Sequence, residues 1–117
     1  MSPVPGPSLI TTHVLDTALG RPATDVTVTL HAIVAHDDVH VATSRTDADG
    51  RVSDLGPAHL EPGTYRLVFD TAAYHASTGQ PGFFPEVAIT FTVDDGAVHH
   101  HVPLLLSPYA YSTYRGS

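Results

Sequence analysis

The sequence contains no cysteine, no lysine and no asparagine. Without cysteine the chain can form neither a disulfide bond nor a thiolate metal site, and without asparagine it has no N-glycosylation sequon. Five arginines are its only basic residues besides histidine, against 12 acidic residues, and the formal net charge is −7 with the histidines neutral. Because polyanions are bound through clustered basic residues, we expect no nucleic-acid partner. An anionic small molecule would require a local patch of arginine and histidine.

Long apolar runs are also missing. No segment approaches the roughly 18 apolar residues of a membrane span, so we expect no membrane partner. Residues 1–10 contain three prolines and neither a basic start nor an apolar stretch, unlike a secretory signal. These features predict a cytoplasmic location.

The length of 117 residues is typical of one domain, and 42% of the residues are hydrophobic, which suffices for a packed core. A domain this small buries a modest fraction of its surface and gains from association. We expect a flexible Pro-rich leader over residues 1–8 and a folded domain over residues 9–117.

Short runs of alternating polarity, separated by turn residues, predict an all-β fold. We expect strands near residues 9–16, 26–31, 39–46, 64–69, 87–93 and 98–106, and a last β-prone segment over 109–117. A hairpin loop is expected at 36–38 and a turn at 47–50, and a turn at 94–96 predicts that the strands on either side form a second hairpin. Helix-compatible residues over 71–79 predict one short helix. Seven or eight short strands at regular spacing indicate a sandwich of two sheets.

Nine histidines in 117 residues are the strongest compositional anomaly, and histidine suits proton transfer near neutral pH. His36, His40, His59 and His75 lie in or near expected loops without partner spacing, so we interpret them as solvated surface residues. His99 and His101 differ, because alternate residues of a strand project to one face, while His100 between them projects to the other.

Two alternatives to ordinary surface histidines follow from this pattern. If His13 came alongside His99 and His101, three imidazoles could hold a zinc ion with an open position for water, as in a zinc-dependent cyclic amide hydrolase. The Asp47-x-Asp49-Gly50 segment resembles part of a calcium loop but lacks its other ligands, so we interpret it as a turn.

Four stretches of the sequence carry a family pattern. They are Thr12-His13-Val14-Leu15-Asp16 followed by Gly20-Arg21-Pro22-Ala23, Thr46-Asp47-Ala48-Asp49-Gly50-Arg51, Phe83-Phe84-Pro85-Glu86-Val87, and the C-terminal run from His101 through Pro108-Tyr109 to Tyr114-Arg115-Gly116-Ser117. They resemble the corresponding segments of the 5-hydroxyisourate hydrolases, the transthyretin-related enzymes of purine catabolism. The Tyr-Arg-Gly-Ser ending separates these hydrolases from the hormone-carrying transthyretins.

The resemblance implies a transthyretin-like two-sheet β-sandwich of about eight strands, as two four-stranded sheets, with one short helix. It also implies a homotetramer with sites in clefts between subunits. The implied reaction is hydrolytic opening of the six-membered ring of 5-hydroxyisourate, in urate degradation, to 2-oxo-4-hydroxy-4-carboxy-5-ureidoimidazoline. The implied mechanism requires no metal or organic cofactor.

Carried over position by position, the resemblance implies that His13, Arg51, His101 and Ser117 are catalytic. His13, Arg51 and Tyr114 are implied to bind the substrate. Either His101 or His13 would serve as general base, and the guanidinium of Arg51 would stabilise the oxyanion. The alternative to a hydrolase is a small-molecule binding protein like the transthyretins. The polar set argues against an apolar ligand, which would leave each of these groups buried and unpaired at a cost of about 1–3 kcal/mol.

Overall fold

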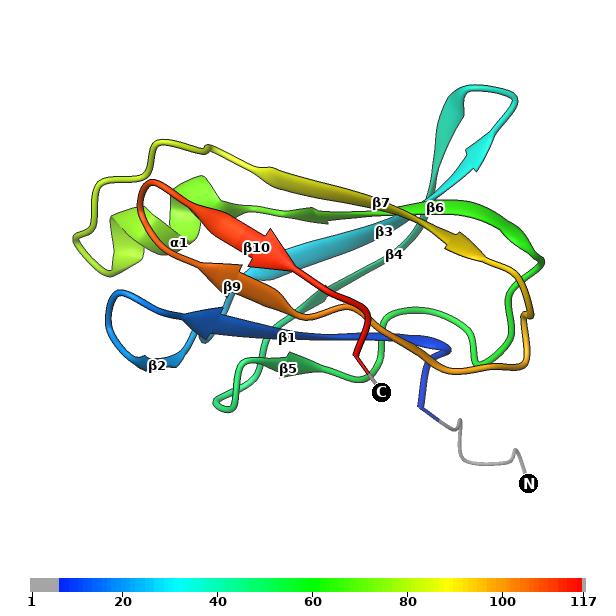
Figure 1. Ribbon diagram of the computed structural model, residues 1–117, viewed down its shortest axis with the longest axis horizontal. Coiled ribbons are helices and arrows are strands. Elements are labelled where there is room, and N and C mark those ends of the chain that lie inside the picture. The colour runs from blue at the N-terminus through cyan, green and yellow to red at the C-terminus, as the bar shows by residue number, and fades with distance from the viewer. Residues whose placement is uncertain (1–6, 117) are drawn as a thin grey trace.

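The computed structural model describes residues 7–116 and consists of strands with one helix (Figure 1). Bounds follow in chain order: β1 (Ile10–Asp16), β2 (Arg21–Pro22), β3 (Thr27–Val34), β4 (Asp37–Arg45), β5 (Arg51–Val52), β6 (Gly63–Phe69), α1 (Thr71–Ser77), β7 (Val87–Val93), β8 (His100–His101), β9 (Leu104–Leu106) and β10 (Tyr111–Thr113). In the described part of the chain, no helix is long and apolar enough to cross a membrane.

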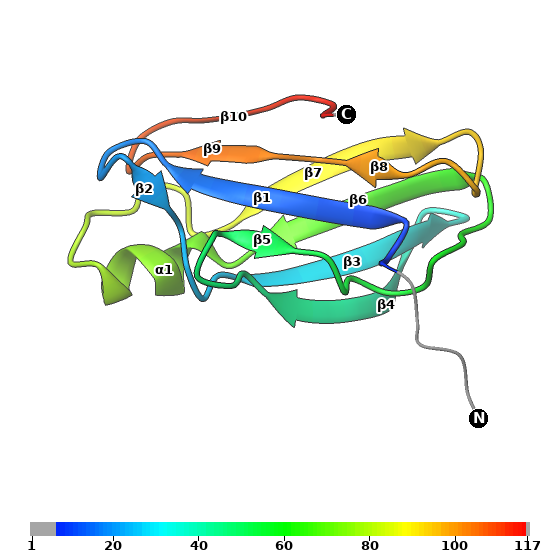
Figure 2. The same ribbon diagram turned by 90° about the horizontal axis from the view of Figure 1, so that it is seen from below.

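These strands form two sheets that lie face to face, as Figure 2 shows from below. One sheet has the order β4-β3-β6-β7, with every neighbouring pair antiparallel. The other is built around β1, which pairs in parallel with β8 and β9 and antiparallel with β2 and β5, while β10 pairs antiparallel with β9. The predicted all-β sandwich with one short helix is confirmed.

The strand count differs from the prediction: ten strand segments form, rather than about eight, and the sheets hold six and four of them instead of four each. The expected strand over 98–106 is split into β8 and β9, because Pro103 has no N–H to donate to a ladder. Thr12 bridges the break by donating its hydroxyl to the carbonyl of Val102 at 2.6 Å. The two-residue β2 adds one more segment.

One predicted hairpin is confirmed, with its loop at residues 35–36 instead of 36–38, and one is wrong. β3 and β4 are joined by Ala35 and His36, whose φ angles of 51° and 70° suit a two-residue loop with the twist of a hairpin. The turn at 94–96 does not form a hairpin, because β7 pairs with β6 while the chain after Gly96 crosses to the other sheet and pairs with β1. Alternating polarity identifies a strand but not its partner.

The core lies between the two sheets. It consists largely of side chains at alternate positions of the strands, which point inward. His100 is buried at 6% exposure, on the face opposite His101, as the alternation predicts. The largest fully buried side chains are Phe69, Ile10, Leu30, Leu55, Leu67, Leu104 and Leu106.

The N-terminal part of the expected leader, residues 1–6, lies outside the described residues. Ser8, at its end, is buried and tied to the domain. Its hydroxyl accepts a hydrogen bond from the Leu55 amide at 2.9 Å, and its amide donates to the Ser53 carbonyl at 3.0 Å. The structure therefore holds the chain from Ser8 onward.

A buried carboxylate connects β1 to the helix. Asp16 is 1% exposed and accepts hydrogen bonds from the Tyr74 hydroxyl at 2.6 Å, the Gln80 amide at 2.9 Å and the Leu19 backbone at 2.8 Å. Burial alone would raise the pKa of Asp16, but these hydrogen bonds together outweigh it and hold the pKa below its usual 3.8. Burial and the bond to Asp16 raise the pKa of Tyr74, so the tyrosine stays a donor.

We expect Tyr74→Phe to lower the free energy of unfolding at pH 7 by about 1–3 kcal/mol, because a buried carboxylate loses one of its donors. A lowered carboxyl pKa stabilises the fold above pH 3.8, and that contribution is lost as the pH falls through the folded-state pKa. The difference between the variant and the wild type should therefore shrink in acid. Urea unfolding at pH 7 and at pH 3, at one protein concentration, measures it.

Tyr65→Phe is the matched control, because Tyr65 is also buried but donates its hydroxyl to the backbone carbonyl of Glu61. Its effect on stability should not depend on the titration of Asp16. Equal and pH-independent losses in both variants would contradict the assigned role of the Asp16 carboxylate.

Candidate active site

The outer face of the sheet around β1 gathers side chains from three strands. In β1, Thr11 and His13 alternate with core-facing residues and project outward. β5 places Arg51 directly opposite His13, and β8 places His101 directly beside Thr11. Residues about 40 and 90 positions apart in the chain therefore share one surface because of strand register.

Arg51 is positioned by the turn that precedes it. Asp47 Oδ1 accepts hydrogen bonds from the backbone amides of Asp49 at 2.9 Å and Arg51 at 3.0 Å. The hydrogen bond from the Arg51 amide is the largest influence on the pKa of Asp47 and lowers it. Gly50 has a φ of 75°, and a Cβ there would meet the carbonyl oxygen of Val14. The predicted turn is thus confirmed, and it holds the exposed guanidinium next to β1.

His13 is half-buried and reaches the same turn. Its Nε2 lies 2.9 Å from the carbonyl oxygen of Asp49. A carbonyl only accepts, so Nε2 of His13 carries the proton in this contact. His13 is therefore fixed to the turn that carries Arg51.

His101 is held by β1 and by its neighbour on the same face. Its Nδ1 lies 2.8 Å from the Thr11 hydroxyl, which also lies 2.8 Å from Nε2 of His99. The rings of His99 and His101 are stacked with centroids 6.3 Å apart. The prediction that both histidines project to one face is confirmed.

Burial and nearby positive charge disfavour the imidazolium form of His101. Partial burial is the largest cause that lowers its pKa below the usual 6.5, followed by the charge of Arg51 and then by His99 and His13. A lowered pKa leaves this imidazole neutral near pH 7. It is then able to accept a proton.

Two cavities meet at His101. One, of about 210 Å³, is lined by Thr11, Arg51 and His99 among others, and the other, of about 330 Å³, is lined by Tyr114 and residues of β7. His101 lines both. Arg51 and Tyr114 therefore line neighbouring cavities that share this imidazole.

The C-terminal tail closes over His101. The Gly116 amide donates to the His101 carbonyl at 2.8 Å, and a Cβ on Gly116 would come within 2.6 Å of Cδ2 of the His101 ring. Only glycine allows this close approach. Tyr114 is 59% exposed, and Ser117, predicted to be catalytic, lies outside the described residues.

The zinc alternative lacks its ligand set. Within residues 7–116, no three histidine, aspartate or glutamate side chains come together in a way that could hold a metal ion. Nε2 of His13 faces a carbonyl, and the Thr11 hydroxyl engages the nearest nitrogens of His99 and His101. The three imidazoles share a face without converging on one point.

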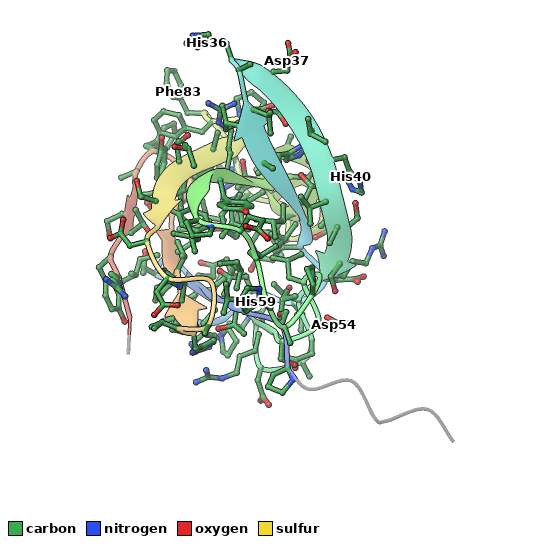
Figure 3. The ribbon with its side chains drawn as sticks, turned by 90° about the vertical axis from the view of Figure 1, so that its right-hand side faces the viewer. His36, Asp37, His40, Asp54, His59 and Phe83 are labelled. Atoms are coloured by element: carbon green, nitrogen blue, oxygen red, sulfur yellow. The ribbon has the colours of Figure 1, made fainter. Side chains whose placement is uncertain are left out.

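The remaining histidines divide into exposed and buried ones. His36 and His40 lie on the periphery of the β3–β4 hairpin, and His59 is also exposed (Figure 3). The interpretation of His75 as a surface residue is wrong: it is 2% exposed and packs against Tyr74. It belongs to the inward face of α1, which loop-like sequence context conceals.

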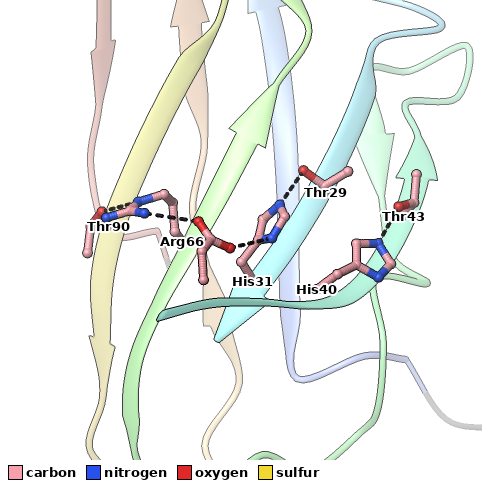
Figure 4. Close-up of polar contacts among 7 residues, drawn as sticks. Thr29, His31, His40, Thr43, Arg66 and Thr90 are labelled. Atoms are coloured by element: carbon pink, nitrogen blue, oxygen red, sulfur yellow. Dashed lines mark hydrogen bonds and ion pairs between the residues drawn. The ribbon is translucent and has the colours of Figure 1, made fainter. Parts of the chain in front are cut away.

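A second polar chain, not anticipated from the sequence, crosses the outer face of the other sheet (Figure 4). His31 lies 2.9 Å from the Thr29 hydroxyl and 2.6 Å from Asp38, which also pairs with Arg66 at 3.1 Å. Thr29 and His31 belong to β3, whose backbone amides in this region are used for pairing with β4 and β6. These amides are therefore not free to bind an oxyanion, and the side-chain contacts serve to link the strands.

The sequence of this chain is similar to those of known proteins. A profile described as the HIUase/Transthyretin family matches residues 10–116. The 5-hydroxyisourate hydrolase of Mus musculus is 46% identical over 113 residues, covering 94% of this chain and 96% of that protein.

Solved structures show the same fold in both branches of this family. The 5-hydroxyisourate hydrolase of Klebsiella pneumoniae superposes with a TM-score of 0.82 at 36% identity, covering 92% of this chain and 98% of that one. Sea bream transthyretin in complex with thyroxine superposes with a TM-score of 0.85 at 30% identity, covering 92% and 93%. Backbone similarity does not separate hydrolase from carrier, so the side chains of the site must do so.

Proposed function

The chain belongs to the HIUase/Transthyretin family, and we propose that it hydrolyses 5-hydroxyisourate at the face formed by His13, Arg51 and His101. The reaction opens the six-membered ring to 2-oxo-4-hydroxy-4-carboxy-5-ureidoimidazoline. One observation carries the proposal: the guanidinium of Arg51 and the imidazole of His101, whose pKa is lowered by burial and then by the charge of Arg51, line the same open cavity. These are the groups that ring opening of a cyclic amide needs, a base for water and a donor for the oxyanion.

The hydrogen bonds favour His101 over His13 as the general base. His13 uses Nε2 as a donor to the Asp49 carbonyl. His101 forms its hydrogen bond through Nδ1, and among the described residues its Nε2 has no hydrogen-bond partner. The lowered pKa of His101 keeps it in the basic form. His101 thus removes the proton from the attacking water, and His13 orients the ring or the water.

Arg51 supplies the positive charge that this acidic protein otherwise has little of. Its planar fork of donors suits two oxygens of the substrate, and it stabilises the negative charge that develops on the carbonyl oxygen. Tyr114, which lines the neighbouring cavity, is assigned a contact with the substrate ring, and Ser117 is assigned a catalytic role. The chain's own residues perform each of these steps.

The homotetramer implied by the family resemblance and the cytoplasmic location predicted from the sequence belong to the same proposal. β7 and β10 are the end strands of their sheets, and the cavity between them is lined by Ile89, Phe91 and Tyr114. Apolar side chains along two sheet edges support association of subunits there. Sedimentation equilibrium should give four times the mass of one chain.

Product analysis tests the reaction itself. The protein is added to 5-hydroxyisourate freshly generated from urate, and carbon NMR follows the products. We expect the ureidoimidazoline to accumulate faster than in buffer, and to the same extent in the presence of a chelator. Products identical in rate to the buffer control would refute the hydrolase, and loss of turnover with chelator would restore the zinc alternative.

The carrier alternative predicts different behaviour. A transthyretin-like binding protein would bind thyroxine tightly and leave 5-hydroxyisourate decay unchanged. Calorimetric titration with thyroxine, run beside the product analysis, separates the two functions.

Gly116→Ala tests the contact between the tail and the base. Because a Cβ at this position would overlap the His101 ring, either the ring or the tail must move. A displacement near 1 Å at a catalytic group costs about 10²-fold in rate, so we expect a drop of that order in kcat/KM. Gly63→Ala is the control, since a Cβ there meets nothing within 4 Å. Equal activity of the two variants would show that the tail does not fix His101.

A further inference from the structure

Thr11 joins two histidines through a single hydroxyl group. Its Oγ1 lies 2.8 Å from Nδ1 of His101 and 2.8 Å from Nε2 of His99. The contact with His101 follows from the parallel register of β1 and β8, which places the two residues side by side. Thr11 is only 9% exposed, whereas His99 is exposed. The three groups therefore form a chain that leads from the site to the surface.

A hydroxyl has one hydrogen and two lone pairs, so it can donate to only one of these rings, and two arrangements use its hydrogen in this way. In one arrangement His101 donates its Nδ1–H to Thr11, and Thr11 donates to Nε2 of His99. In the other arrangement both directions are reversed. The first leaves the lone pair of His101 on Nε2, and the second leaves it on Nδ1.

Of these two arrangements, the first is compatible with both protonation states of His101. An imidazolium donates from both ring nitrogens, so its Nδ1 can face Thr11 only if the hydroxyl accepts. Starting from the reversed arrangement, the hydroxyl would have to rotate as the proton arrived. An arrangement that needs no rotation is preorganised for proton transfer, which lowers the cost of the step.

We propose that Thr11 and His99 are positioning residues that hold His101 in the tautomer with its lone pair on Nε2. Thr11 orients the ring by accepting from Nδ1–H, and His99 sets the direction of the Thr11 hydroxyl by accepting its hydrogen at Nε2. Both residues act through His101. The inference rests on the proposed function, because it takes His101 as the general base.

Kinetics of Thr11 variants test this role. Thr11→Val keeps the shape and the β-branched side chain but removes the hydroxyl. We expect kcat to fall by about 10- to 100-fold through misorientation of the base, with KM nearly unchanged. Thr11→Ser retains the hydroxyl and should recover most of the lost kcat. A serine variant as slow as the valine variant would contradict the role of the hydrogen bond.

His99 should matter only through Thr11. His99→Phe keeps an aromatic ring but removes the acceptor, and we expect a smaller fall in kcat than for Thr11→Val. Because residues in one hydrogen-bond chain are coupled, the double variant should be no slower than Thr11→Val alone. Additive losses would show that the two residues act independently.

Thr29→Val is the matched control on the other sheet. Thr29 Oγ1 also lies 2.9 Å from an imidazole nitrogen, Nε2 of His31, so the substitution removes the same kind of contact far from β1. We expect kcat and KM to remain those of the wild type.

Nitrogen-15 NMR of the imidazoles tests the tautomer without substrate and without any variant. We expect His101 to carry its proton on Nδ1 in the wild type, and to become a mixture of tautomers in Thr11→Val. An Nε2-protonated His101 in an active wild type would overturn this inference and leave the hydrolase standing. A protein that fails to accelerate ring opening would refute the proposed function, while the tautomer would still be measurable.

Discussion

His101→Asn is expected to lower kcat/KM for 5-hydroxyisourate by about 10²- to 10⁴-fold, the usual contribution of a general base. Asparagine retains a polar group that can face Thr11, but it cannot accept a proton at neutral pH. The fold should persist, because the His101 side chain lies on the outer face of its sheet. Steady-state kinetics and circular dichroism of the purified variant measure both outcomes.

The pH profile supports the same assignment. Because the pKa of His101 lies below 6.5, the basic form persists below that pH, and kcat/KM should fall only as the pH drops through the lowered pKa. The small residual rate of His101→Asn should lack this acid limb. His40→Asn, the same change at an exposed histidine on the other sheet, should leave rate and profile intact. An unchanged acid limb in His101→Asn would assign the limb, and the base, to another residue.

Arg51→Gln is expected to lower kcat/KM by about 10²- to 10³-fold, because the developing oxyanion loses its main donor. A second effect follows from the charge. Arg51 is among the groups that lower the pKa of His101, so its removal should raise that pKa and move the acid limb to higher pH. Kinetics across the pH range measure both effects in one variant.

Arg51→Lys separates charge from geometry. Lysine keeps the positive charge but not the planar fork, so the acid limb should return toward its wild-type position while much of the rate stays lost. Arg45→Gln is the control, because Arg45 pairs with Asp25 on the exposed edge of the other sheet. An acid limb that stays fixed in Arg51→Gln would show that Arg51 does not act on His101.

Much of the fold follows from local patterns in the sequence. The alternation over residues 87–93 and the turn residues at 47–50 each predict what the structure contains. Strand pairing does not follow from such patterns. The turn at 94–96 predicts a hairpin of β7 and β8, whereas the two strands belong to different sheets. The break between β8 and β9 at Pro103 does follow from the sequence, because proline has no N–H to donate to the hydrogen-bond ladder.

The site could be predicted only in part from the residues themselves. Alternation places His99 and His101 on one face. The approach of Arg51 to His13 depends on the pairing of β5 with β1, and only the family resemblance predicts that these two residues share a site. Thr11 carries no sequence signal, because threonine is common in strands and its role depends on the register with β8. Burial of His75 was missed for a related reason, since a seven-residue helix shows little periodicity.

The decay of freshly generated 5-hydroxyisourate, followed by ultraviolet absorbance at increasing protein concentration, tests the central claim most directly. If the face of His13, Arg51 and His101 opens the ring, the observed rate constant will rise in proportion to protein above the spontaneous rate, with or without a chelator. A rate constant that stays at the spontaneous value across all concentrations, in an assay where a known hydrolase is active, would contradict it.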